Sequence, residues 1–104
     1  MNFMTTNPAA ERWTSLLLEQ GYCVIPNLVS PLIVESIDSD LAADFEETPF
    51  CSGSFYGERT KRFGRLLIRS RRARELVQHP LVLAIVRNVL SRWCDTVQLN
   101  LTQA

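Results

Sequence analysis

The last nine residues, Thr96 to Ala104, limit the folds open to this chain more than any other segment does. Polar and apolar side chains alternate strictly from Thr96 to Thr102, as expected of a β-strand with one face on a core. Uncharged amides and hydroxyls on the other face suit the wall of a ligand cavity in a barrel or sandwich, whereas in an ordinary edge strand they face solvent. The alternation therefore predicts a sheet. Its polar face is expected either to line a ligand cavity or to face solvent. That face carries Thr96, Gln98, Asn100 and Thr102.

Charge is distributed unevenly along a chain that is neutral overall. The 104 residues have a formal net charge of zero and are 46% hydrophobic, which is typical of a single small globular domain. Residues 31–47 hold six acidic side chains and no basic one, whereas residues 59–74 hold eight basic side chains and no acidic one. The neutral sum gives no general attraction to nucleic acid or to a membrane surface. Any electrostatic recognition is therefore expected to be local.

The cysteines and the N-terminal residues predict a cytoplasmic protein. Cys23, Cys51 and Cys94 are odd in number, widely spaced and without a CxxC pair, which favours reduced thiols over a disulfide framework or a zinc site. The N-terminus lacks the basic and apolar regions of a signal peptide. The longest apolar run, residues 81–86, is far too short to cross a bilayer, so no membrane partner is expected.

Cap residues followed by proline predict where helices begin. Asn7-Pro8 opens a helix that Gly21 ends, and Ser30-Pro31 opens another that runs to about Phe45. Ser70 caps a short basic helix over residues 71–78, and a last helix follows from Pro80 to about Ser91. Residues 22–25 are β-prone and predict a short strand. The helices are expected to bury Trp13, Leu16, Leu17 and Leu18, then Leu32, Ile33, Ile37, Leu41 and Phe45, and then Val82, Ile85, Val86 and Val89.

A long irregular stretch, residues 46–64, separates the acidic helix from the basic one. Stretches of this length in a compact domain are commonly functional or disordered, and the aromatic residues here argue against disorder because they need packing partners. Its end, Arg59-Thr-Lys-Arg62, could hold a carboxylate or phosphate by bidentate hydrogen bonds from arginine. The alternatives are a solvated basic face and a nucleic-acid patch.

The sequence offers little catalytic chemistry of its own. Its only histidine, His79, stands before Pro80 at a helix junction, where capping or packing is the expected role. The chain lacks a GxGxxG motif and a P-loop, and one histidine cannot supply the two-histidine, one-carboxylate site of a non-haem iron enzyme. No catalytic residue and no metal ligand is therefore predicted.

Several segments, in their order and spacing, resemble phytanoyl-CoA dioxygenase-like enzymes. The segment GYCVIPNLVS at residues 21–30, followed by an acidic amphipathic helix, is similar to the opening of that family. Later pieces that match are GERTKR at 57–62, LVQHP at 76–80, VLAIV at 82–86 and QLNLTQA at 98–104. The resemblance covers residues 14–104, which is nearly the whole chain.

The resemblance implies an Fe(II)- and 2-oxoglutarate-dependent oxygenase with an α+β fold. In the family an N-terminal helical layer packs on a double-stranded β-helix, or jelly roll, which here would be truncated before the metal site. The family's His-x-Asp pair, second metal histidine and 2-oxoglutarate-binding arginine follow beyond a segment like residues 98–104. The chain is thus expected to be an N-terminal portion, inactive by itself, that binds neither iron nor 2-oxoglutarate tightly. By resemblance, the cosubstrate contacts are Lys61 and Asn100, with Gln98 and Thr102 beside them.

Three hypotheses follow. In the first, the chain is part of an oxygenase whose complete form hydroxylates a small-molecule substrate. In the second, it is a small non-enzymatic module that binds an acidic partner or nucleic acid through residues 59–74. In the third, it is a structural or regulatory remnant that self-associates, because a strand at the end of the chain leaves an open edge.

Overall fold

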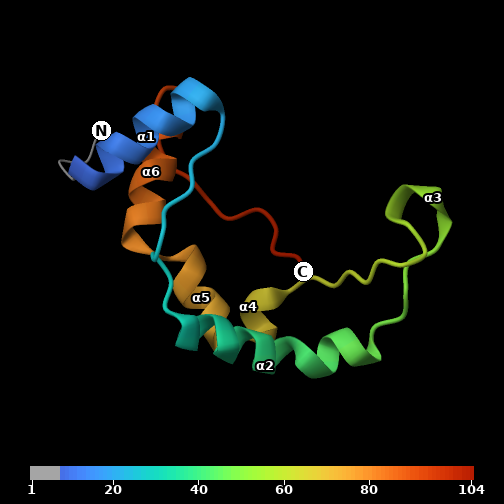
Figure 1. Cartoon of the computed structure of the whole chain (residues 1–104). Coiled ribbons are helices and arrows are strands. Elements are labelled where there is room, and N and C mark those ends of the chain that lie inside the picture. The colour runs from blue at the N-terminus through green and yellow to red at the C-terminus, as the bar shows by residue number, and fades with distance from the viewer. Residues whose placement is uncertain (1–7) are drawn as a thin grey trace. The chain divides into compact units, whose positions relative to one another are not determined.

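The computed structural model describes residues 8–104, and in this range the chain folds into helices joined by irregular segments (Figure 1). The helices are α1 (Pro8–Gln20), α2 (Pro31–Glu47), α3 (Gly53–Tyr56), α4 (Leu66–Arg69), α5 (Arg71–Val77) and α6 (Pro80–Leu90). Contacts divide the described residues into two compact units. The first unit contains residues 8–28 and 76–99, and the second contains residues 29–75 and 100–104. The organisation as one domain stays a prediction.

The first unit is built on the packing of α1 against α6 (Figure 1). Its core consists of Ala10, Ala84 and Ile85, surrounded by partly buried side chains that include Trp13 and Leu17. The two alanines let the backbones of α1 and α6 approach closely. The larger side chains of Trp13 and Leu17 pack around this contact. The predicted apolar stripes are confirmed in part, because Ile85 is buried and Leu17 half-buried whereas Leu18 is exposed.

Local signals at the ends of these two helices act as the sequence predicts. Gly21 follows α1 with a φ of +84° and donates its N–H to the carbonyl of Leu17 at 2.9 Å. This left-handed conformation carries no steric cost at glycine, so the helix ends there. His79 precedes α6, and its Nδ1 accepts a hydrogen bond from the N–H of Leu81 at 3.2 Å, which confirms the capping role. The predicted cap at Asn7 lies outside the described residues.

In the second unit, α2 is the longest helix of the described chain. Ser30 caps it by accepting a hydrogen bond from the N–H of Leu32 at 3.2 Å, as predicted. The helix continues to Glu47, slightly beyond the expected end, where Thr48 Oγ1 donates to the carbonyl of Asp44 at 2.5 Å. Of the predicted apolar face, Leu41 is buried but Leu32 is exposed. One amphipathic helix therefore offers more apolar surface than its unit covers.

Residues 46–69 contain two short helices that the sequence did not reveal. The four-residue α3 lies within residues 46–64, and α4 follows at Leu66 after Arg65, whose φ of +59° is left-handed. The helix predicted after Ser70 is confirmed as α5. Ser70 caps it, because its Oγ accepts a hydrogen bond from the N–H of Ala73 at 3.3 Å.

The prediction of an α+β fold with jelly-roll strands is wrong for the residues described. No strand occurs within residues 8–104, and neither residues 22–25 nor residues 96–102 belong to a sheet. The β-type pairing in this range is a single antiparallel bridge between Gly64 and Gln103. Alternation of polar and apolar side chains specifies which residues would share a face of a strand. A strand forms only where its backbone N–H and C=O groups hydrogen-bond to a neighbouring segment. Within the described chain, no backbone hydrogen bond joins residues 96–102 to a neighbouring segment.

Candidate functional site

The buried centre of the second unit is the ring of Phe63. It lies edge-on to the ring of Phe45, with centroids 4.6 Å apart, and the guanidinium of Arg69 lies 5.0 Å from its centroid. Arg69 also forms an ion pair with Asp44 and donates from Nε to the carbonyl of Gly64 at 2.7 Å. One arginine therefore ties α2 and α4 to the segment that carries Phe63.

The last residues of the sequence are held against this segment. The N–H of Phe63 donates to the carbonyl of Ala104 at 3.1 Å, and the N–H of Ala104 donates to the carbonyl of Phe63 at 3.0 Å. Next to this pair, a Cβ at Gly64 would lie 3.3 Å from the carbonyl oxygen of Thr102. This close approach is available to glycine because glycine has no side chain. The chain thereby gains two reciprocal backbone hydrogen bonds between residues about forty positions apart in sequence.

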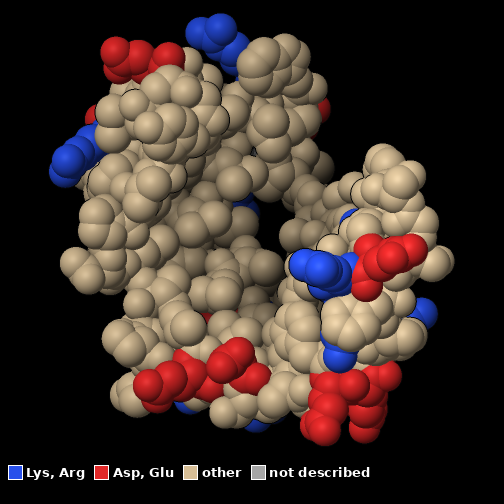
Figure 2. Space-filling model, turned by 45° about the vertical axis from the view of Figure 1, so that its right-hand side comes forward, with Lys and Arg blue, Asp and Glu red and all other residues tan. Residues whose placement is uncertain are grey.

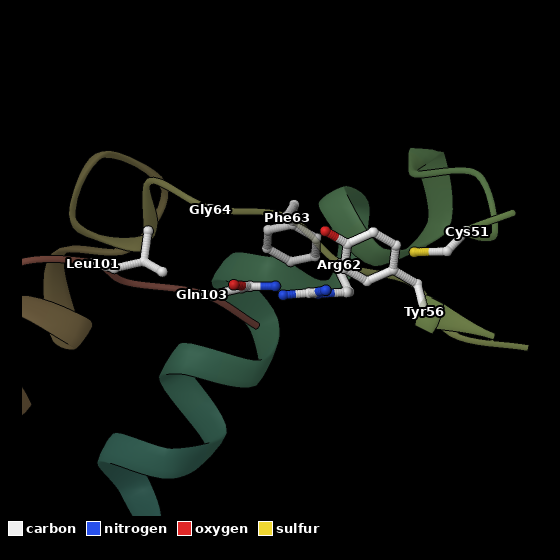
Figure 3. Close-up of a pocket in the computed structure, with 7 residues that line it drawn as sticks. All are labelled: Cys51, Tyr56, Arg62, Phe63, Gly64, Leu101 and Gln103. Atoms are coloured by element: carbon white, nitrogen blue, oxygen red, sulfur yellow. The ribbon is translucent and has the colours of Figure 1, made fainter. Parts of the chain in front are cut away.

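A pocket of about 370 Å³ opens beside these paired segments. Its apolar wall includes Phe63 and Leu101, and its polar groups belong to Arg62 and Gln103. The guanidinium of Arg62 lies 4.3 Å from the centroid of the Tyr56 ring. Figure 3 shows these two side chains next to each other. The full lining is Cys51, Tyr56, Arg62, Phe63, Gly64, Leu101 and Gln103, all of which belong to the second unit. The site therefore joins one cation to a mainly apolar surface.

The four predicted cosubstrate residues have different surroundings. Lys61 is half-buried, donates from Nζ to the carbonyl of Phe45 at 2.8 Å and lies 4.9 Å from the centroid of the Phe50 ring. Thr102 Oγ1 accepts a hydrogen bond from the N–H of Leu66 at 3.0 Å, at the start of α4. Asn100 and Gln98 are exposed. The pocket is lined instead by Arg62 and Gln103, which are the sequence neighbours of Lys61 and Thr102. The role of the four predicted residues in 2-oxoglutarate binding stays a prediction.

The basic block, residues 59–74, is largely engaged within the second unit. Besides Lys61 and Arg69, Arg62 lies on Tyr56, Arg72 pairs with Glu75 at 2.8 Å, and Arg74 donates to the carbonyl of Leu67 at 2.6 Å. Each of these contacts orients one cation toward an aromatic ring, a carboxylate or a backbone carbonyl. The block therefore does not form a uniform basic face.

Ser70 and Asp40 form a partly buried contact that sequence reasoning missed. Ser70 is 1% exposed, and its hydroxyl donates to Oδ2 of Asp40 at 2.7 Å. The same oxygen of Ser70 accepts a hydrogen bond from the N–H of Ala73. One hydroxyl therefore hydrogen-bonds both to the first turn of α5 and to a side chain of α2. The capping role was visible in the sequence, but the partner thirty residues away was not.

We expect Ser70→Ala to destabilise the chain by roughly 1–3 kcal/mol, because it removes a cap and leaves a buried N–H and a carboxylate oxygen without their partner. Urea unfolding followed by circular dichroism measures this loss. Ser54→Ala, at an exposed position in α3, is the matched control and should change stability by less than about 0.5 kcal/mol. Equal effects of the two substitutions would mean that the Ser70 contacts contribute nothing.

Residues 8–104 contain no group of three or more histidine, cysteine and acidic side chains placed to hold a metal ion. Within the same range, no helix combines the length and the apolar character needed to cross a membrane. Cys23, Cys51 and Cys94 are half-buried free thiols.

Comparison of the chain with protein-family models, with curated proteins and with solved structures gives no match. The resemblance to phytanoyl-CoA dioxygenase-like enzymes therefore rests on the segments quoted from the sequence.

Proposed function

We propose that the chain is the N-terminal portion of a phytanoyl-CoA dioxygenase-like, Fe(II)- and 2-oxoglutarate-dependent oxygenase of the cytoplasm, and that it is inactive without the residues that bind iron. The complete enzyme hydroxylates a small molecule. The proposal joins the family resemblance to one structural observation, which is the amount of apolar surface that the chain leaves uncovered.

Uncovered apolar surface is the main support for this proposal. Among residues 8–104, fourteen large apolar side chains are exposed whereas only six apolar residues are buried, and three of those six are alanines. Phe55 is 88% exposed, Ile68 77% and Trp93 71%. The face drawn in Figure 2 is mostly uncharged, with the charged side chains in separate groups. Apolar surface of this extent is typical of chains that pack against further protein, as the N-terminal portion of an oxygenase would.

The engagement of the basic block favours this proposal over a module that binds an acidic partner or nucleic acid. Four of its eight cations donate hydrogen bonds or form ion pairs within the second unit. Non-specific phosphate binding requires several free cations on one face, because each neutralised phosphate contributes separately to the affinity. The contacts of Arg72 and Arg74 compete with such binding.

The setting of Lys61 is compatible with a cosubstrate contact. Its ammonium group has three donors, and the carbonyl of Phe45 takes one of them. The ring of Phe50 restricts the side chain, so the two remaining donors start from a defined position. An oxygenase could use them for a carboxylate of 2-oxoglutarate.

The open reading frame that includes codon 104 tests the proposal directly. It should encode a His-x-Asp pair soon afterwards, and its complete product should convert 2-oxoglutarate to succinate when Fe(II) is supplied. A product without that iron motif, or one that leaves 2-oxoglutarate unchanged, would refute the assignment.

In this complete product, Lys61→Ala should weaken apparent 2-oxoglutarate affinity about ten- to a hundred-fold, since a charge-assisted contact is worth roughly 1.5–3 kcal/mol. Arg72→Ala is the control, because Arg72 pairs with Glu75 and should leave the affinity nearly unchanged. Both affinities are measured with iron saturating. Equal losses would indicate a diffuse charge effect, and an unchanged Lys61→Ala affinity would remove Lys61 from the cosubstrate site.

A further inference from the structure

The pocket in the second unit is lined by one cation, Arg62, which forms no ion pair within the described residues. The ion pairs of residues 8–104 join Arg69 to Asp44 and Arg72 to Glu75, so within this range Arg62 has no acidic partner. Its guanidinium lies 4.3 Å from the centroid of the Tyr56 ring. Arg62 is therefore available for an anion from outside the described chain.

The contact with Tyr56 also prepares Arg62 for such an anion. The ring attracts the charged guanidinium without accepting a conventional hydrogen bond, so N–H donors of Arg62 remain for a ligand. These N–H groups form a planar fork that matches the two oxygens of one carboxylate. Because the ring restricts the side chain, less conformational entropy is lost when the carboxylate binds.

The rest of the pocket provides an apolar surface. Phe63 is 8% exposed and is held in place by Phe45 and by its two backbone hydrogen bonds with Ala104. Leu101 contributes a second apolar side chain, and Gln103 adds an amide that can donate or accept. The volume of about 370 Å³ lies within the range of small-molecule sites, which is roughly 300–1,000 Å³. Figure 3 shows these side chains around the pocket.

We propose that this pocket binds a small monocarboxylate with an apolar body. The carboxylate is bound by the edge of Arg62, and the apolar body lies on Phe63 and Leu101. A phosphate monoester fits less well, because Arg62 is the only cation among the lining residues and a doubly charged group would keep part of its charge unmatched. The inference is independent of the proposed function, since it uses residues of this chain alone and requires neither iron nor 2-oxoglutarate.

Binding of 3-phenylpropionate to the 104-residue chain, followed by NMR titration, tests the charge contact. Arg62→Ala should weaken binding at least tenfold, because one bidentate charge-assisted contact is lost. Arg59→Ala removes the same charge from an exposed position outside the pocket and should change affinity less than twofold. Equal weakening by both variants, or none by Arg62→Ala, would overturn the proposal.

Two ligand analogues test the same contacts on the unaltered chain, so the result does not depend on how a variant folds. 3-Phenylpropanol keeps the apolar body and lacks the carboxylate, and acetate keeps the carboxylate and lacks the body. Each should bind at least tenfold more weakly than 3-phenylpropionate. If either analogue binds as well as 3-phenylpropionate, the pocket does not recognise the combination proposed.

The cysteines offer an independent measurement of where the ligand binds. Cys51 lines the pocket, whereas Cys23 and Cys94 do not, and all three thiols are half-buried. Saturating 3-phenylpropionate should slow alkylation of Cys51 by iodoacetamide at least threefold and leave Cys23 and Cys94 unchanged, as mass spectrometry of the peptides can measure. Equal protection of all three, or protection of Cys23 or Cys94 alone, would place the ligand elsewhere.

Discussion

Phe63→Ala is expected to destabilise the second unit by about 3–5 kcal/mol, which is the usual cost of deleting a buried phenylalanine ring. Phe63 is the buried residue on which the ring of Phe45 and the guanidinium of Arg69 converge. Its removal leaves a cavity between α2 and the segment paired with Ala104. Because small domains are stable by only about 5–15 kcal/mol, the loss should bring this unit close to unfolding. Urea unfolding followed by circular dichroism measures it.

Phe55→Ala is the matched control for this prediction. Phe55 is largely exposed, and its ring contacts Tyr56 with centroids 4.9 Å apart. Deleting this ring should cost less than about 1.5 kcal/mol, since an aromatic pair at the surface buries little area. If both substitutions cost the same, Phe63 would not be the centre of a packed unit.

Ile85→Ala is expected to destabilise the first unit by about 2–5 kcal/mol. Ile85 is the one large buried side chain in a core that otherwise consists of Ala10 and Ala84, so no other buried side chain can fill the space it leaves. Trp13 packs against this core, and its fluorescence during urea unfolding should report the change. The midpoint is expected to move to lower urea with little change in slope.

Ile68→Ala is the control, because it removes the same atoms from a side chain that is mostly exposed on α4. Its effect should lie within about 0.5 kcal/mol of zero. A loss at Ile68 as large as that at Ile85 would mean that Ile68 is covered in solution, for example by self-association. Sedimentation at several protein concentrations distinguishes that case from a packing error.

These two predictions bear on function because each unit has a small buried core and a large apolar surface. A single core substitution should therefore have an effect close to the whole stability of a unit, whereas most surface substitutions should not. In the proposed complete oxygenase, further protein covers part of the exposed apolar surface. The same core substitutions should then cost a smaller fraction of the total stability.

The starts and ends of the main helices could be predicted from the sequence alone. Ser30, His79 and Gly21 act on backbone groups no more than four residues away, so their effect depends little on the rest of the fold. The capping role of Ser70 is of the same kind. Such contacts are encoded by neighbouring residues, and they are the part of this structure that the predictions describe correctly.

Pairing between distant segments was decided by the tertiary structure. The alternation over residues 96–102 predicted a sheet, but in the described chain the backbone pairing joins Phe63 and Gly64 to Ala104 and Gln103, beyond that stretch, and the result is one bridge. The position of the pocket followed from the same contact, since it brought Gln103 and Leu101 beside Arg62. Arg62 belongs to the stretch of residues 59–62 that was predicted to hold an anion, whereas the family resemblance pointed to Lys61. Side-chain order along a segment determines which residues share a face, but a backbone partner must come from elsewhere in the chain, and the sequence pattern does not specify where it lies.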